Sequence, residues 1–92
     1  MRISASEQVA TWLVALPPQT KRRVRLALRS LANGKGDVKG LQGPLEGFNR
    51  LRIGGMRVIF RQISGKEILL EYANTRDAVY ELYQRILENR RA

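Results

Sequence analysis

Residues 50–61 read Arg50-Leu-Arg-Ile-Gly-Gly-Met-Arg-Val-Ile-Phe-Arg61, two alternating runs on either side of a double glycine. Such a pattern predicts a hairpin with Gly54 and Gly55 as its two-residue turn. Directly paired residues share a face of the sheet, and side chains alternate along each strand. One face is therefore apolar, with Leu51, Ile53, Met56, Val58 and Phe60. The other face is basic, with Arg50, Arg52, Arg57 and Arg61.

Within this register Arg52 lies directly opposite Arg57. Like charges that face each other across a hairpin destabilise it. We therefore expect an anionic group between these two side chains.

The whole chain is short and strongly basic. Its 92 residues are the length of one small domain, spanning residues 1–92. Seventeen lysines and arginines against eight acidic residues give a net charge of +9 and a pI of about 11.1. This excess predicts a polyanionic partner, which can be a nucleic acid, an acidic protein or both. Arginine predominates, and its planar fork matches phosphate bidentately.

Histidine and cysteine are both absent. The chain therefore lacks the commonest general base at neutral pH, the usual zinc ligands and any disulfide. We expect no metal and no cofactor, so that any chemistry must use carboxylate, tyrosine, lysine or arginine. No apolar run approaches the roughly 20 residues of a membrane span, and no signal-peptide pattern is visible, so we expect a soluble, cytoplasmic protein without a membrane partner.

The N-terminal third predicts a short edge strand followed by two helices. Ser4 and Glu7 have the spacing of a capping box, and apolar residues at helical spacing predict a helix over about 5–16. Pro18 can open the second helix, which the Asn33-Gly34 pair should end.

The middle of the chain predicts a loop and then strands. Residues 34–44 are rich in turn formers, with Leu41 as the expected anchor to the core. The hairpin should span about 45–63, and a further strand about 67–73.

The register of that last strand is open between two alternatives. A three-residue turn places Ile68, Leu70 and Tyr72 on the apolar face and Glu71 among the arginines, whereas a two-residue turn reverses this. We prefer the first, because it buries no carboxylate.

A last helix should follow Asn74, with Thr75 or Asp77 as its N-cap, and its apolar stripe comprises Val79, Leu82, Ile86 and, as a further candidate, Tyr83. The predicted fold is α+β, with an N-terminal helical hairpin packed on a small, mainly antiparallel sheet. Because one sheet face carries arginines, we expect helices on the other face only and an exposed basic surface.

Two segments resemble a known family. Residues 41–60, with the portion Arg-Leu-Arg-Ile-Gly-Gly-Met-Arg-Val-Ile-Phe, and the later Arg76-Asp-Ala-Val-Tyr80 resemble the RelE/ParE toxins of bacterial toxin–antitoxin modules. Length, element order and charge agree with that family over nearly the whole chain.

The resemblance implies one of two activities. RelE-like members are metal-independent endoribonucleases, many of which cleave mRNA on the ribosome, and ParE-like members inhibit DNA gyrase. In both branches an acidic antitoxin neutralises the toxin.

The resemblance also implies catalytic residues. Arg57 matches the arginine that contacts the scissile phosphate in the ribonuclease branch. Arg76 and Tyr80 match an active-site arginine before the last helix and a tyrosine in its first turn. This Arg-x-x-Val-Tyr ending favours the ribonuclease branch over the gyrase branch. Many ribonuclease members have a histidine where this chain has Thr75.

The remaining expected contacts are to RNA along the basic face. They comprise Arg50, Arg52, Arg61 and Phe48. The best-known ribonuclease member has lysines in the second strand, where this chain has Arg50 and Phe48. Phe48 falls on the basic face, where an aromatic ring can stack on a base.

Metal-free RNA cleavage needs a base for the 2′-hydroxyl, stabilisation of the phosphorane and an acid for the leaving oxygen. Arg57 and Arg76 can supply the stabilisation. Tyr80, Glu46 and Glu71 are the candidate bases, and Tyr80 can alternatively stack on a nucleobase. The other possibilities are a gyrase inhibitor without catalysis, and a plain nucleic-acid-binding module or a toxin whose active site has decayed.

Overall fold

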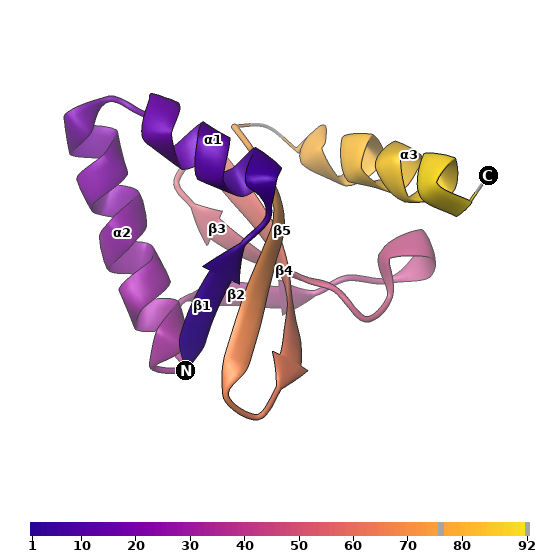
Figure 1. Ribbon diagram of the computed structural model, residues 1–92, viewed down its shortest axis with the longest axis horizontal. Coiled ribbons are helices and arrows are strands. Elements are labelled where there is room, and N and C mark those ends of the chain that lie inside the picture. Colours follow the sequence, from indigo (N-terminus) through magenta and orange to yellow (C-terminus); the bar gives the residue numbers. More distant parts are fainter. Residues whose placement is uncertain (76, 92) are drawn as a thin grey trace.

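A computed structural model describes residues 1–75 and 77–91 of the chain (Figure 1). The elements follow one another as β1 (Arg2–Ala5), α1 (Glu7–Ala15), α2 (Pro18–Ala32), β2 (Asp37–Gly40), the 3₁₀ turn η1 (Gly43–Leu45), β3 (Asn49–Ile53), β4 (Met56–Ser64), β5 (Glu67–Asn74) and α3 (Val79–Arg91). The strands form one sheet in the order β1-β5-β4-β3-β2. Among the described strands, the pairing of β1 with β5 is parallel and the others are antiparallel. The predicted α+β class and the mainly antiparallel sheet are confirmed.

The β3–β4 hairpin has the predicted register. Ile53 pairs with Met56, and Arg52 pairs with Arg57. Gly54 adopts a φ of +58°, a left-handed conformation that glycine reaches without a Cβ clash.

The first core lies between the apolar face of the sheet and the helical hairpin α1–α2. Its buried residues are Val9, Val24, Leu31, Leu51, Ile53, Met56, Val58, Phe60, Ile68, Leu70 and Ala73. All five apolar hairpin residues predicted from the alternation belong to it, and Trp12 of α1 packs against it. The N-terminal helical hairpin therefore covers the face that the sequence indicated.

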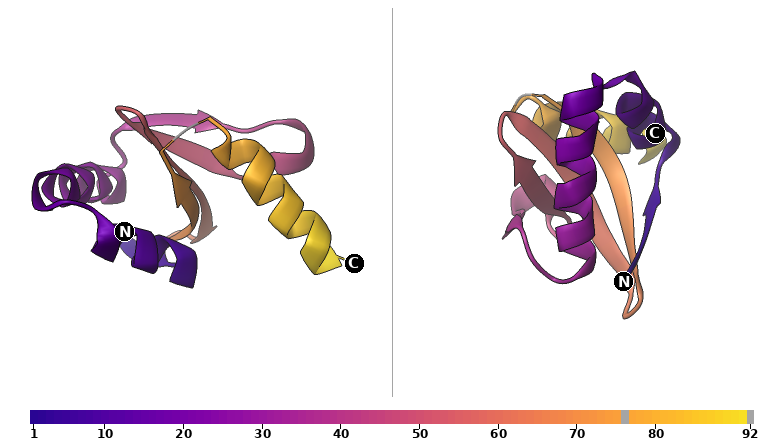
Figure 2. Two further views of the ribbon diagram at one scale, coloured as in Figure 1. Left: turned by 90° about the horizontal axis from the view of Figure 1, so that it is seen from above. Right: turned by 90° about the vertical axis from the view of Figure 1, so that its left-hand side faces the viewer.

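A second core lies on the opposite, arginine-bearing face. Ile59 of β4 is fully buried there against Leu45, Val79 and Tyr83. Figure 2 shows α3 on the side of β4 and β5 opposite to α2. The expectation that helices cover only one face is therefore wrong. Ile59 lies between Arg57 and Arg61 on the same face of β4, and α3 packs against this apolar side chain.

The preferred register of β5 is correct for Ile68 and Leu70 but wrong for Tyr72. Ile59 pairs with Tyr72 and the next residue of β4 pairs with Leu70, so Glu71 is the extra residue of a β-bulge. The bulge reverses the alternation, and Tyr72 therefore packs in the second core.

Two local expectations are also corrected. The N-cap of α1 is Ser6, whose Oγ accepts a hydrogen bond from the Val9 backbone N–H, whereas the Ser4 hydroxyl donates to Glu67. The expected loop at 34–44 contains β2, which extends the sheet beyond β3. Leu41 does reach a core, since it packs against the second one. Within the described residues, no helix is long and apolar enough to cross a membrane.

The second core gives a stability prediction with a matched control on the same strand. Ile59→Ala should lower the free energy of unfolding by about 3 kcal/mol, because it opens a cavity between the sheet and α3. Ile63→Ala, at a position that is 43% exposed, should change it by less than about 0.5 kcal/mol. Urea unfolding followed by the fluorescence of the single tryptophan, Trp12, measures both. Equal losses in the two variants would contradict a packed second core.

Candidate active site

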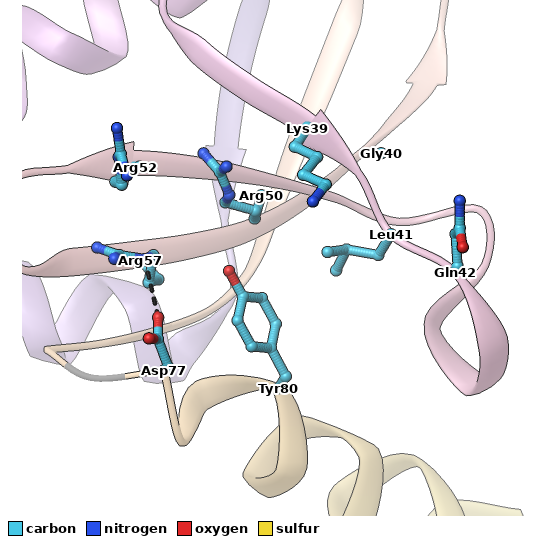
Figure 3. Close-up of a pocket in the computed structure, with 9 residues that line it drawn as sticks. All are labelled: Lys39, Gly40, Leu41, Gln42, Arg50, Arg52, Arg57, Asp77 and Tyr80. Carbon is cyan, nitrogen blue, oxygen red and sulfur yellow. Dashed lines mark ion pairs between the residues drawn. The ribbon is translucent and has the colours of Figure 1, made fainter.

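A pocket of about 450 Å³ opens between the strands β2, β3 and β4 and the start of α3 (Figure 3). Its lining is mainly basic and polar. It comprises Lys39, Gly40, Leu41, Gln42, Arg50, Arg52, Arg57, Asp77 and Tyr80. The sheet register brings the three arginines together, and the docking of α3 adds the tyrosine.

Asp37 of β2 holds two of these arginines in place. Its Oδ1 accepts a hydrogen bond from Arg50 Nη1 at 3.1 Å, and its Oδ2 accepts one from Arg52 Nε at 2.7 Å. Arg50 Nη1 also donates to the Asp37 backbone carbonyl at 3.0 Å. The hydrogen bond from Arg50 and the charge of Arg52 hold the pKa of the Asp37 carboxyl below its ordinary value. One carboxylate thus fixes two guanidinium groups on neighbouring positions of the pocket wall.

Arg57 is held at three points, and its side chain is only 16% exposed. Its Nη1 donates to the backbone carbonyls of Gly54 at 2.8 Å and Met56 at 3.0 Å. Its Nε lies 3.2 Å from Asp77 Oδ1. Of the guanidinium nitrogens, Nη2 makes no hydrogen bond with another described residue, so it remains for a ligand.

Tyr80 stands on the first turn of α3, opposite the strands. Figure 3 shows its ring rising from the helix, with the hydroxyl pointing toward the strands that carry Arg50 and Arg57. Its orientation follows from Val79 and Tyr83, which are both buried in the second core. Lys39 projects into the same space from β2.

The structure brings together four of the seven residues that the sequence nominated, namely Arg50, Arg52, Arg57 and Tyr80. Arg76 lies outside the described residues. Arg61 is farther along β4, where its Nε lies 3.1 Å from Glu71 Oε1. Phe48 packs edge-on against Tyr83, with ring centroids 5.4 Å apart, and does not line the pocket.

The two carboxylates nominated as bases do not line the pocket either. Glu46 follows η1 on the surface. The Glu71 side chain is only 10% exposed and accepts hydrogen bonds from Arg61 and from the Tyr83 hydroxyl. Burial and the bond to Glu71 raise the pKa of Tyr83, so this phenol stays neutral and donates. Glu71 therefore anchors α3 to the sheet.

The sequence reasoning missed Lys39, Gln42 and the role of Asp77 in the pocket. Recognising β2 as a strand paired with β3 would have placed Lys39 beside Arg50, its pairing partner. Asp77 was noted only as a helix cap. Within the described residues, no group of three or more acidic side chains could hold a metal ion.

Comparison with known proteins rests on the fold alone, because no family model and no curated protein sequence matches the chain. A chain of the RelB–RelE antitoxin–toxin complex from Methanococcus jannaschii is similar with a TM-score of 0.65 at 19% identity, over 86% of this chain and 96% of that one. YafQ from E. coli is similar with a TM-score of 0.67 at 17% identity, over 87% and 99%. The YoeB/ParE toxin from Agrobacterium tumefaciens is similar with a TM-score of 0.59 at 18% identity, over 82% and 98%.

The chain has the RelE/ParE toxin fold. The resemblance inferred from the arginine-rich hairpin is thereby confirmed at the level of the fold, over 86–87% of the chain.

The ion pairs of Asp37 with Arg50 and Arg52 predict that the stability of the protein depends on pH. Because the folded-state pKa of Asp37 is depressed, its contribution to stability is full above about pH 3.8 and is lost as the pH falls through the folded-state value. Asp37→Asn should therefore be less stable than the parent at pH 7, and this difference should shrink as the pH falls below about 3.8. The side chains of Asp37 and Arg52 are about half exposed, so the effect is small. Urea unfolding between pH 7 and pH 3 measures it. Glu46→Gln serves as a control that should follow the parent throughout, and a pH-independent deficit for Asp37→Asn would contradict the ion-pair interpretation.

Proposed function

We propose that this protein is the toxin of a toxin–antitoxin pair and that it cleaves mRNA on the ribosome without a metal. The observation that carries the proposal is the convergence of Arg50, Arg52 and Arg57 with Tyr80 in one pocket. The fold supports it, since the similar structures include a named toxin and an antitoxin–toxin complex.

The first step is to hold the RNA backbone. Arg50 and Arg52 present guanidinium groups fixed by Asp37, and Lys39 adds a mobile ammonium beside them. These groups suit successive phosphates on either side of the scissile one. Exposed basic residues on α2 offer a second surface, suited to ribosomal RNA, with Arg22, Arg25 and Arg29. Binding should accordingly weaken as salt rises.

The second step is attack by the 2′-hydroxyl on the adjacent phosphorus. Charge then builds on the equatorial oxygens, and the guanidinium of Arg57 can stabilise it through Nη2 because its other donors hold it in place. Tyr80 faces the same space and can donate to the leaving 5′-oxygen. Arg76, which precedes it in the sequence, is proposed to share the phosphate charge on the strength of the family resemblance. The products are a 2′,3′-cyclic phosphate and a 5′-hydroxyl.

The proposed partner is a small acidic antitoxin. The net charge of +9 gives the toxin a strong attraction for an acidic chain. The similar RelE fold in Methanococcus jannaschii was solved as an antitoxin–toxin complex. The second candidate function is inhibition of DNA gyrase without catalysis, as in the ParE branch, and the similarity to a structure named as a YoeB/ParE toxin favours it.

Expression of the protein in bacteria separates the two candidates. Induction should arrest growth, translation should fall before DNA synthesis, and primer extension should reveal new mRNA ends. Replication that stops first while mRNA stays intact would favour the gyrase candidate and reject the ribonuclease.

Substitutions in the pocket test the named groups. Arg57→Ala and Tyr80→Phe should each lower RNA cleavage by about 100-fold or more, because each removes a group that acts in the transition state. Arg85→Ala is the matched control, since Arg85 lies on the exposed side of α3, paired with Glu81. Urea unfolding should show unchanged stability for Tyr80→Phe and Arg85→Ala. Unaltered cleavage by both pocket variants would remove Arg57 and Tyr80 from the site.

A further inference from the structure

Asp77 contributes the only carboxylate among the described residues that line the pocket. The proposed cleavage requires a proton acceptor for the 2′-hydroxyl, and arginine cannot serve because it stays protonated. We propose that Asp77 is this acceptor. The inference rests on the proposed ribonuclease function and assigns the group that the function still lacks.

The position of Asp77 relative to Arg57 supports the assignment. Its Oδ1 lies 3.2 Å from Arg57 Nε, and the dashed line in Figure 3 marks this pair. Nε and Nη2 lie on the same edge of the planar guanidinium, so acceptors bound to the two nitrogens are neighbours. A phosphate held by Nη2 therefore lies beside the Asp77 carboxylate, and so does the ribose hydroxyl that attacks it.

The freedom of Asp77 separates it from the other carboxylates near the site. Its side chain is 77% exposed, and its Oδ2 makes no hydrogen bond with another described residue. Asp37 uses both oxygens to hold Arg50 and Arg52. The side chain of Glu71 is only 10% exposed and accepts hydrogen bonds from Arg61 and Tyr83. Of these three carboxylates, Asp77 alone lines the pocket, and it combines an oxygen without a described partner with one that is held by Arg57.

The step balances with the groups present. The proton of the 2′-hydroxyl passes to Asp77 Oδ2 while O2′ forms a bond to phosphorus. The bond from phosphorus to O5′ then breaks, and O5′ leaves with the bonding pair and takes the proton of the Tyr80 hydroxyl. The protonated Asp77 and the Tyr80 phenolate are restored by proton exchange through water, with no oxidant or further reactant.

The test is Asp77→Asn, which keeps the shape of the side chain and removes its basicity. Cleavage of a short RNA, free and bound to ribosomes, should fall in kcat by about 100-fold or more, while KM stays the same or decreases. Asp77→Glu, which restores a carboxylate, should recover part of the rate. Equal stability of the variants in urea shows that the fold is kept. A rate that is unchanged or higher in Asp77→Asn would show that Asp77 merely shields Arg57, and would overturn the proposal.

An RNA substrate with sulfur in place of the bridging 5′-oxygen tests the base separately from the acid. The thiolate leaving group needs no proton, so the reaction no longer depends on the general acid. On this RNA the defect of Tyr80→Phe should largely disappear, and that of Asp77→Asn should remain. Recovery of Asp77→Asn on the sulfur substrate would overturn its role as the base. If the parent protein cleaves neither RNA, the ribonuclease function itself fails, whereas an active parent with an active Asp77→Asn overturns only the present inference.

Discussion

Repulsion between Arg52 and Arg57 is the constraint around which the pocket is arranged. The β3–β4 register places them directly opposite each other, and such a pair destabilises a hairpin unless opposite charge lies nearby. The sequence suggested one anion between the two. The structure instead gives each arginine its own carboxylate, Asp37 for Arg52 and Asp77 for Arg57. These aspartates come from β2 and from the segment before α3, which form two walls of the pocket.

The second core determines where the remaining wall lies. Val79 and Tyr83 are four residues apart, so they occupy one face of α3 and pack together on Ile59. The hydrogen bond from Tyr83 to Glu71 adds a polar anchor to the same sheet face. With that helical face fixed, the position of Tyr80 on the first turn of α3 faces the strands that carry the arginines. The orientation of Tyr80 in the pocket thus follows from the packing of Tyr83, about one turn further along α3.

Local sequence patterns correctly predicted the features of the fold that depend on residues close together in the chain. The double glycine and the alternation of residues 50–61 specify the hairpin, its register and its two faces. They do not specify what covers the arginine face, because one apolar residue, Ile59, has a partner only after α3 folds back. The bulge at Glu71 and the short strand β2 were not predicted from the sequence for the same reason. Both are stabilised by pairing with β4 or β3, and the glycine-rich sequence around β2 has little strand propensity of its own. The sequence nominated Asp77 as one of two candidate helix caps, but its contact with Arg57 joins two segments twenty residues apart.

The ion pairs in the pocket limit the affinity that the proposed RNA binding can gain there. Of the four cations among the described residues that line the pocket, the three arginines have carboxylate partners, and Lys39 is the fourth. A phosphate that enters therefore exchanges ion pairs, and it gains less affinity than four unpaired cations would give it. The affinity of the proposed RNA complex must then come largely from outside the pocket. The exposed arginines of α2 are the surface proposed for this, on the side of the sheet opposite to α3. Inside the pocket the carboxylates maintain geometry. In the proposed cleavage, Arg57 is already held by two carbonyls and by Asp77, so that little reorganisation would be needed when charge develops on the phosphorane.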